Sequence, residues 1–244
     1  MTSTGDTAAV EPVETADGST TGRHVATGAT YRSIYGALTE VRHVFIESTG
    51  LHFAESGTEW SVVELGFGLG TSFVETARYA VEQGIKLDYL SVEREPARAD
   101  MVQHDWEPAH DMAVKALREL ANAAETTIYH GEIRLTVQRE DWLNADLGEG
   151  ADAVYFDPFD PSINPESWTQ EAFAAAHQAL SPRGRLATYS AAGHVRRALA
   201  RSGFRLATRP GPGRKREITV ASPTDSGLGG FERLSMERYL RAES

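Results

Sequence analysis

The sequence predicts an α/β fold in which a mostly parallel sheet carries helices on both faces and an antiparallel strand at one edge. From residue 59 onward, short apolar runs alternate with amphipathic segments, as in parallel strands joined by helices. Two further apolar runs, Phe204–Thr208 and Glu217–Ala221, can pair as a closing hairpin. The length of 244 residues suits one domain, and 41% hydrophobic residues suffice for a packed core.

Strands and helices are predicted in regular alternation. The predicted strands are short apolar runs, and they cover Trp60–Leu65, Leu87–Val92, Ile133–Val137, Ala153–Phe156 and Leu186–Tyr189. The predicted helices have apolar residues at helical spacing, and they cover Thr71–Gln83, Pro96–Ala123, Trp168–Leu180 and His194–Ser202. Pro182–Gly184 is predicted as a turn, and Phe231–Leu240 as a short final helix.

These elements divide the chain into four parts. Residues 1–22 are rich in Thr, Gly, Ala and acids without periodicity, which predicts a flexible tail. Residues 23–58 mix aromatic and polar residues, and we expect them to pack on the core. Residues 59–222 form the predicted α/β domain, and residues 223–244 form a tail that carries the short helix.

Composition excludes several kinds of chemistry. The chain has no cysteine, which excludes disulfides, thiolate zinc sites and a cysteine nucleophile. The eight histidines show no metal-ligand spacing, so we expect no metal. No apolar run approaches the ~18 residues of a membrane span, and no signal pattern begins the chain, so we expect a cytoplasmic protein without a membrane partner. The net charge of −11 argues against a uniformly basic, nucleic-acid-binding surface.

A glycine-rich turn follows the first predicted strand. Its glycines, Gly66, Gly68 and Gly70, allow a sharp turn and a close approach of the backbone to a ligand. The third glycine comes one residue earlier than in the G-x-G-x-x-G pattern of dinucleotide sites. Glu64, just before the turn, would face a pyrophosphate unfavourably. The turn therefore favours a positively charged ligand without phosphate, such as S-adenosylmethionine.

Acids also follow the next two predicted strands. Glu93 could accept hydrogen bonds from both ribose hydroxyls, Asp141 could hold the adenine amino group, and Trp142 could cover the adenine ring. The carboxyl ends of parallel strands meet at one edge of a sheet, where open α/β sheets bind ligands. We therefore expect Glu64, Glu93, Asp141 and Trp142 to share a cofactor site with the glycine turn. Solvated strand ends and a packing role for Trp142 are the alternatives.

A loop with two prolines begins at the end of the fourth predicted strand. Residues 157–161 read Asp-Pro-Phe-Asp-Pro, and the prolines stiffen the loop. Its carbonyls and the Asp157 carboxylate could accept hydrogen bonds from a substrate amine, and Phe159 could face a flat base. The loop resembles the acid-Pro-Pro-aromatic loop of amino-group methyltransferases, which implies in-line methyl transfer to an unprotonated nitrogen, with Asp157 either orienting the amine or taking its proton. Methylation of pyrimidine carbon 5 commonly relies on a cysteine, which is absent. A rigid turn is the alternative interpretation.

Basic residues cluster late in the chain. We name this cluster the arginine strip, and it comprises Arg196, Arg197, Arg201, Arg205, Arg209, Arg214, Lys215 and Arg216. In an acidic chain, such a cluster indicates contact with a polyanion, because arginine binds phosphates through paired N–H donors. The alternative is a solvated helix face with ion pairs to the many acids.

Several motifs together resemble one known family, the tRNA 5-methylaminomethyl-2-thiouridine methyltransferases. This family comprises the methyltransferase half of the bifunctional MnmC enzymes and the stand-alone MnmD type. The resemblance covers residues 28–222. It rests on Tyr31-x-Ser33, Arg42-His43-Val44-Phe45, Glu64-x-Gly66-Phe67-Gly68, Asp157-Pro158-Phe159, Asn164-Pro165-Glu166-x-Trp168, Thr188-Tyr189-Ser190-Ala191-x-Gly193-x-Val195-Arg196-Arg197 and Gly213-Arg214-Lys215-Arg216-Glu217.

The resemblance implies a Rossmann-like class I methyltransferase domain at residues 59–222 that uses S-adenosylmethionine. It also implies N-methylation of the 5-aminomethyl group on wobble uridine 34 of tRNA. By this resemblance Glu64, Gly66, Phe67, Gly68 and Glu93 would bind the cofactor, Asp141 would reach the adenine, and Asp157, Pro158 and Phe159 would make the catalytic contacts with the amine. Gly70 and Trp142 join the expected cofactor site from the glycine turn and the strand ends described above. Apart from what the resemblance implies, we expect the substrate side to be lined by Tyr31, Ser33, Glu40, Arg42, Ser190, Arg196, Arg197, Arg214, Lys215 and Arg216.

Two further expectations accompany this interpretation. We expect a separate oxidase to supply the aminomethyl intermediate, because the flavin-dependent half of the bifunctional enzymes has no counterpart in these residues. The alternative function is methylation of a small-molecule amine, which the low basicity of the chain favours and the arginine strip disfavours. A cofactor-binding RNA-interaction module without activity is a third hypothesis, and the intact Asp-Pro-Phe loop argues against it.

Overall fold

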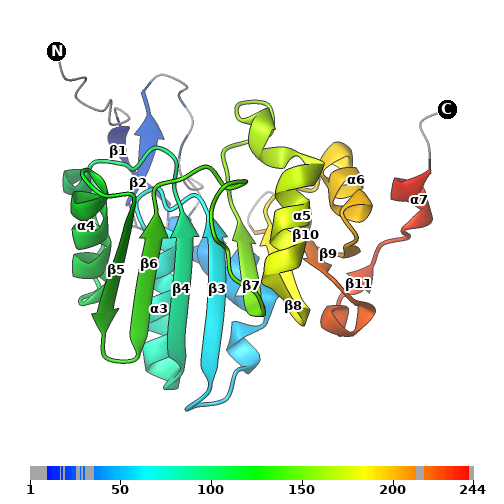
Figure 1. Cartoon of the computed structure of the whole chain (residues 1–244), viewed down its shortest axis with the longest axis horizontal. Coiled ribbons are helices and arrows are strands. Elements are labelled where there is room, and N and C mark those ends of the chain that lie inside the picture. The colour runs from blue at the N-terminus through cyan, green and yellow to red at the C-terminus, as the bar shows by residue number, and fades with distance from the viewer. Residues whose placement is uncertain are drawn as a thin grey trace.

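A computed structural model describes residues 10–16, 18, 20–25, 28, 30, 36–212 and 217–241. Within these residues, nine strands form one sheet with the order β11-β9-β10-β8-β7-β3-β4-β6-β5 (Figure 1). Five adjacent strands run parallel, and they are β3 (Glu59–Leu65), β4 (Lys86–Val92), β6 (Ile133–Gln138), β7 (Ala151–Phe156) and β8 (Leu180–Thr188). The predicted parallel sheet is confirmed.

Antiparallel strands extend both edges of this parallel core. β10 (Glu217–Ser222) pairs with β8 and with β9 (Arg205–Pro210), which confirms the hairpin, and β11 (Glu232–Arg233) follows β9. At the other edge, β5 (Glu125–His130) pairs with β6. The sequence analysis did not predict β5, because threonine and charged residues hide its short apolar pattern.

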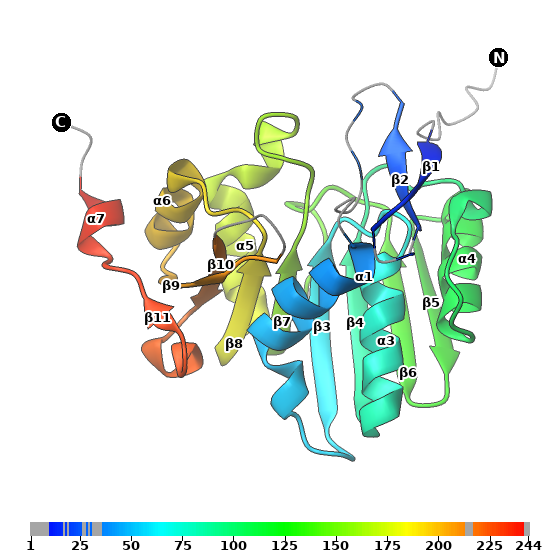
Figure 2. The same ribbon diagram turned by 180° about the vertical axis from the view of Figure 1, so that it is seen from behind.

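Helices cover both faces of the sheet. On one face lie α3 (Thr71–Gln83), α4 (Ala109–Leu120) and a continuous helical segment at residues 37–49 (Figure 2). That segment comprises α1 (Ala37–Glu40), a π-helix (Val41–Ile46) and α2 (Glu47–Thr49). The other face carries α5 (Gln170–Ala179) and α6 (Gly193–Arg201) (Figure 1).

Aromatic side chains fill the core on the two faces. Phe45 of the helical segment stacks on Tyr155 of β7, with ring centroids 4.8 Å apart. On the opposite face, Phe156 of β7 contacts Phe173 of α5 at 4.5 Å. Successive residues of β7 thus anchor the two helical layers, since neighbouring side chains of a strand point to opposite faces. Both anchors stand at the end of the strand that leads into the Asp-Pro-Phe loop.

Two predicted helices differ from the structure. Of the helix expected at residues 96–123, only the 3₁₀ turn Ala99–Met101 and α4 form. Pro108 directly precedes α4, and a proline cannot stand in a helix interior because it has no N–H to donate. The helix expected at residues 168–180 begins at Gln170, after the 3₁₀ turn Pro165–Trp168.

The predicted turn Pro182–Gly184 lies inside β8. Ala151 pairs with Leu180 and Ala153 with Arg185, so the intervening residues of β8 form a bulge. A Cβ at Gly184 would lie 2.6 Å from the Ala151 carbonyl oxygen, so this bulge requires glycine. The proline and glycine were therefore signals of a local irregularity in the strand.

The two ends of the described chain carry small additional elements. Inside residues 1–22, β1 (Val10–Glu14) pairs with β2 (Thr20–His24), although the composition had predicted a tail. Toward the other end, the helix expected at residues 231–240 is limited to α7 (Glu237–Leu240). Shorter 3₁₀ turns cover Leu51–Phe53 and Asp225–Leu228. No helix in the described ranges is long and apolar enough to cross a membrane.

Candidate active site

The carboxyl ends of the parallel strands bring the glycine turn, Glu93 and the Asp-Pro-Phe loop together. Gly66, the first residue after β3, donates its N–H to the Val92 carbonyl at the end of β4, 2.9 Å away. A Cβ at Gly66 would lie 3.7 Å from the Asp157 carbonyl oxygen at the end of β7. Glu93 directly follows Val92. Three segments separated in the sequence therefore share one site at this edge.

The glycine turn has a backbone shape that only glycine adopts readily. Gly66, Gly68 and Gly70 have φ values of 90°, 55° and 73°. A Cβ at Gly70 would also come within 3.0 Å of Ala113 and of the Phe67 ring. Phe67 itself is buried, so its predicted cofactor contact would have to come from its backbone. Gly66 is half-buried at the strand ends, whereas residues 67–70 are buried, and the role of the turn as a ligand cradle stays a prediction.

Glu93 holds this turn in place. The Gly68 N–H donates to Oε2 of Glu93 and the Glu95 N–H donates to Oε1, each at 2.9 Å. Burial raises the pKa of Glu93, while these two amide hydrogen bonds act in the opposite direction. A carboxylate offers about four lone-pair positions, so the two oxygens can still accept from a pair of hydroxyls.

The other predicted acids differ in exposure. Glu64 is completely buried on β3, and its Oε2 accepts a hydrogen bond from the Ser91 hydroxyl at 3.0 Å. Its contact with the cofactor stays a prediction. Asp141 is half-buried, and its Oδ1 accepts from the Leu143 N–H at 3.0 Å, which fixes the turn after β6. Asp141 therefore stands at the same edge of the sheet as Glu93.

Trp142 is a core residue, which contradicts its predicted contact with adenine. Its indole N–H donates to the Ala172 carbonyl of α5 at 2.9 Å, and its ring lies edge-on to Phe156 at 6.0 Å. Only 5% of the residue is exposed. An apolar ring beside the first turn of α5 gains more from burial there than from contact with solvent. The packing alternative for Trp142 is the correct one.

The Asp-Pro-Phe loop is held by two aromatic donors that the sequence analysis missed. The Tyr189 hydroxyl donates to the Pro158 carbonyl, and the Trp168 indole N–H donates to the Phe159 carbonyl, each at 2.8 Å. These carbonyls were expected to be open to a substrate amine, and the structure instead gives each one a protein donor. Pro158 is buried, whereas Asp157 and Phe159 are half-buried. Asp157 and the Phe159 ring are thus the parts of the loop best placed to meet a substrate.

The residues predicted for the substrate side are only partly brought to this edge. Glu40 is buried, and Arg42 forms an ion pair with Glu75 while half of its side chain stays exposed. Ser190 follows β8 and is buried, and its carbonyl accepts from the Thr219 hydroxyl at 2.7 Å. Several predicted residues lie outside the described ranges, namely Tyr31, Ser33, Arg214, Lys215 and Arg216.

The arginine strip does not form a continuous exposed surface in the described residues. Arg196 is buried, with its guanidinium bonded to Thr219, Thr208 and Glu217 at 3.0, 3.3 and 3.0 Å. Its predicted tRNA contact is wrong, because β9 and β10 surround the side chain. Arg197 is half-buried and has an interaction partner, whereas Arg201 is exposed.

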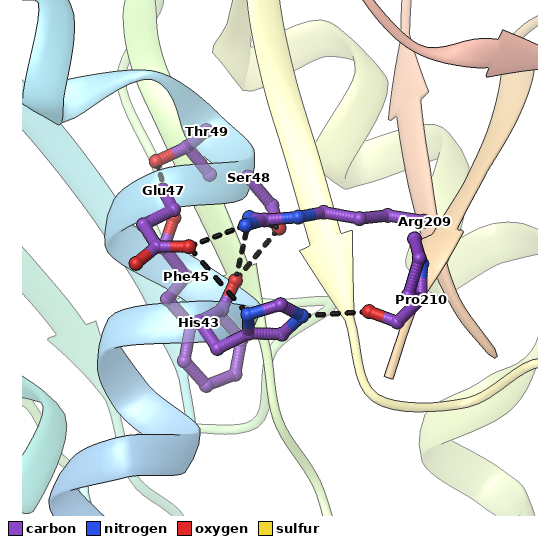
Figure 3. Close-up of polar contacts among 7 residues, drawn as sticks. All are labelled: His43, Phe45, Glu47, Ser48, Thr49, Arg209 and Pro210. Atoms are coloured by element: carbon purple, nitrogen blue, oxygen red, sulfur yellow. Dashed lines mark hydrogen bonds and ion pairs between the residues drawn. The ribbon is translucent and has the colours of Figure 1, made fainter. Parts of the chain in front are cut away.

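Arg209 joins the last hairpin to the helical segment 37–49 (Figure 3). Its guanidinium donates to the His43 carbonyl at 3.0 Å and the Ser48 hydroxyl at 3.1 Å, and it pairs with the Glu47 carboxylate. The His43 ring donates from Nε2 to the Pro210 carbonyl at 2.6 Å. Arg209 is therefore committed to contacts inside the protein.

The position of Arg196 leads to a prediction about stability. Arg196→Ala should lower the free energy of unfolding by about 2 kcal/mol and the Tm by about 4–8 °C, because two buried hydroxyls and Glu217 lose a charged donor. Thermal unfolding followed by circular dichroism measures this change. Arg201→Ala, at an exposed position of the same helix, is the control. An unchanged Tm together with weakened RNA binding would restore Arg196 to the substrate side.

His104 is a second contact of the glycine turn that the sequence did not reveal. Its Nε2 lies 3.0 Å from the Leu69 carbonyl oxygen, so Nε2 carries the proton. Burial lowers the pKa of His104, which keeps the ring neutral. The residue had been interpreted as part of a long helix, and only the loop that replaces this helix brings it to the turn.

We expect His104 to make the stability of the protein sensitive to acid. Because its pKa is lower in the folded state, its contribution is complete above pH 6.5 and declines as the pH falls below 6.5, where the unfolded chain takes up the proton. When the pH is lowered from 7.5 to 5.5, the free energy of unfolding measured with urea should fall by about 1 kcal/mol less in His104→Gln than in wild type. His130→Gln, at an exposed position, should keep the wild-type dependence. Identical pH dependence in all three proteins would contradict this assignment.

A metal is not needed to explain the site. Among the described residues, Glu107, His110 and Asp111 have ligand atoms within 4.8 Å of one another, at the start of α4. The two acids are exposed, and such surface groups are common without an ion. The glycine turn and Glu93, by contrast, fit the expected organic cofactor, because a glycine-rich turn and a carboxylate stand together at the strand ends.

The fold is that of an α/β methyltransferase of the class I type, and the candidate cofactor site lies at the carboxyl ends of the parallel strands. A family model described as S-adenosyl-L-methionine-dependent methyltransferase matches residues 98–224, more than half of the chain. The chain belongs to this family, and S-adenosyl-L-methionine is its cofactor. The cofactor and the resemblance that the sequence analysis inferred are confirmed.

Two relatives resemble this chain over most of its length. The chain is 36% identical over 221 residues to the tRNA 5-methylaminomethyl-2-thiouridine biosynthesis bifunctional protein MnmC of Marinobacter nauticus, covering 82% of this chain and 35% of that protein. The protein of the same name from Ralstonia nicotianae is 35% identical over 205 residues, covering 79% of this chain and 31% of that protein. The chain thus spans about a third of the length of these relatives.

Two solved structures share the architecture. MNMC2 from Aquifex aeolicus superposes with a TM-score of 0.75 at 28% identity, covering 90% of this chain and 72% of that one. Spermidine synthase from Thermotoga maritima superposes with a TM-score of 0.57 at 14% identity, covering 93% of this chain and 73% of that one. The second likeness concerns the fold alone.

Proposed function

We propose that this chain transfers a methyl group to the nitrogen of the 5-aminomethyl group on wobble uridine 34 of tRNA. The observation that carries the proposal is the placement of the Asp-Pro-Phe loop against the glycine turn, with the Asp157 carbonyl oxygen 3.7 Å from the position of a Cβ at Gly66. An acceptor loop so close to the cofactor cradle suits transfer of a small group. The relatives named for tRNA 5-methylaminomethyl-2-thiouridine biosynthesis support tRNA as the substrate.

Residues of this chain would perform the remaining tasks. When bound, the cofactor supplies a methyl group on a positively charged sulfur. The backbone of the glycine turn, Glu93 and Asp141 would hold the cofactor, and the Phe159 ring would lie against the uracil base. Asp157 would accept a hydrogen bond from the substrate amine and so direct its lone pair. In-line positioning of this kind contributes a large part of the rate of a bimolecular transfer.

The protonation of the amine sets a second requirement. An alkyl ammonium has no lone pair for transfer, and a neighbouring carboxylate raises the pKa of an amine. Asp157 therefore helps most if the amine arrives unprotonated or gives its proton to this carboxylate at the site. The half-buried position of Asp157 supports either role.

The proposed partners follow from the substrate. The aminomethyl group has to be generated on the tRNA before methylation, and we propose that a separate oxidase supplies it. Exposed arginines, such as Arg42 beside α3, would contribute to phosphate contacts. We propose that the enzyme acts in the cytoplasm, where tRNA maturation supplies its substrate.

The test is methylation of hypomodified tRNA. The purified chain is incubated with labelled S-adenosyl-L-methionine and tRNA that carries 5-aminomethyluridine at position 34, and the nucleosides are separated by mass spectrometry. Labelled 5-methylaminomethyluridine supports the proposal, and tRNA with unmodified uridine 34 is the control. Label found only on small amines, offered in parallel, would favour the small-molecule alternative. A lack of label on the hypomodified tRNA would contradict the proposal.

A further inference from the structure

We propose that Trp168 and Tyr189 are positioning residues that hold the Asp-Pro-Phe loop in the shape required for methyl transfer. This inference rests on the proposed function of the same site. Neither side chain is assumed to touch the substrate or the cofactor. Their action would be exerted through the two backbone carbonyls to which they donate, those of Phe159 and Pro158.

The two hydrogen bonds fix the peptide planes on either side of one residue. The Pro158 carbonyl belongs to the peptide plane before the Cα of Phe159, and the Phe159 carbonyl belongs to the plane after it. Fixing both planes restricts φ and ψ of Phe159, and with them the direction of its ring. The Pro158 ring already restricts φ at the preceding residue. The chain from Asp157 to Phe159 therefore has little freedom left.

The donors are themselves held by the core. The rings of Trp168 and Tyr189 lie edge-to-face with centroids 5.7 Å apart and an interplanar angle of 79°. Trp168 also contacts Phe156 at 5.4 Å, and only 5% of the residue is exposed. Trp168 comes from the 3₁₀ turn before α5, whereas Tyr189 follows β8. Trp168 and Tyr189, which we call the clamp, thus connect the loop after β7 to two independent, well-packed elements.

A positioning role also agrees with the composition of the loop. Two of the five residues at positions 157–161 are prolines and donate no backbone hydrogen bond. Asp160 supports the part of the loop beyond Phe159, where its Oδ1 accepts from the N–H and the hydroxyl of Ser162 at 2.9 and 2.6 Å. The aromatic pair supports the preceding part of the loop, at Pro158 and Phe159.

Variants that remove each donor and keep a ring test the proposal. Tyr189→Phe and Trp168→Phe should each lower the single-turnover rate of methyl transfer to tRNA about tenfold, because a small misplacement of the reacting groups is costly. The Kd for S-adenosyl-L-methionine should stay within about twofold. In the double variant, the loss should be much smaller than the product of the single losses, since both bonds support one unit.

Matched controls and a second measurement separate the outcomes. Tyr129→Phe alters a tyrosine that is 69% exposed on β5. Trp60→Phe removes an indole N–H that has no hydrogen-bond partner among the described residues, on the strand whose other end leads to the glycine turn. Both should keep wild-type rates. Hydrogen exchange gives a readout that needs no tRNA, and amides at residues 159–164 should exchange faster in Tyr189→Phe than in wild type or either control.

These outcomes distinguish the clamp from the proposed function. Wild-type rates and unchanged exchange in Tyr189→Phe and Trp168→Phe would overturn the clamp. A parallel loss of rate, cofactor affinity and Tm would also overturn it, because the rings would then be general packing residues. If wild-type enzyme does not methylate the hypomodified tRNA, the proposed function is wrong, and the exchange of residues 159–164 still decides whether the pair holds the loop.

Discussion

Replacing Asp157 with alanine is expected to slow methyl transfer to tRNA by 100-fold or more, with the Kd for S-adenosyl-L-methionine changed by less than about twofold. The residue stands at the end of β7 beside the glycine turn, and it contributes one of the two carboxylates of the acceptor loop. A positioned acceptor that orients an amine or takes its proton contributes about 10²–10⁴ to the rate of such reactions. Cofactor binding depends on the neighbouring turn and Glu93, which the substitution leaves in place.

Single-turnover rates and calorimetry measure the two effects separately. Asp146→Ala, at an exposed turn after β6, is the matched control and should behave as wild type. Asp157→Asn adds information, because asparagine keeps an acceptor oxygen but does not take up a proton. A rate within tenfold of wild type would assign the orienting role, and a rate as low as that of alanine would assign proton transfer. Equal losses of rate and cofactor affinity in Asp157→Ala would move this residue to the cofactor site.

The affinity for S-adenosyl-L-methionine is expected to fall about 100-fold when Glu93 is replaced by alanine. The carboxylate accepts N–H donors from Gly68 and Glu95, and we expect it to accept ribose hydroxyls as well. Hydrogen bonds to a charged group are worth about 1.5–3 kcal/mol, and 1.4 kcal/mol corresponds to a factor of ten. Loss of the ribose contacts together with disorder of the turn accounts for the expected change.

Isothermal titration with the cofactor checks this expectation. Glu95→Ala is the matched control, because its exposed carboxylate lies two residues away and its side chain is 3.8 Å from that of Arg94. It should keep wild-type affinity, since the hydrogen bond of this residue to Glu93 comes from its backbone N–H. Glu93→Gln should fall between wild type and alanine. An unchanged Kd in Glu93→Ala would show that the turn binds the cofactor without this acid.

The sequence was sufficient to predict the parts of the site that depend on local pattern. Glycines after a strand, and Glu93 and Asp157 at strand ends, meet at one edge in any parallel sheet, so their order along the chain is enough. The roles of Tyr189 and Trp168 were not accessible in this way. Trp168 donates to a carbonyl nine positions away and Tyr189 to one 31 positions away. The sequence does not specify which way a ring N–H or hydroxyl points.

Charge was the least reliable guide in the sequence. Arg196 belongs to a basic run, and its burial becomes evident only when β9 and β10 place Thr208 and Thr219 around it. Trp142 was misjudged for a related reason, since an aromatic residue after a strand can face a ligand or the neighbouring helix. The long helix expected at residues 96–123 was wrong because helical spacing was given more weight than Pro108.

The contacts of Arg209 have a consequence for how the chain is synthesised. They connect residues 166 and 162 positions apart, so the helical segment 37–49 leaves the ribosome long before its polar anchor exists. Contacts of such high sequence separation form late and slow the folding of a domain. A nascent chain released before β9 would expose Glu47 and the His43 carbonyl without the Arg209 guanidinium that binds them. The first helical segment of the described residues therefore completes its polar contacts only when translation has passed about residue 210.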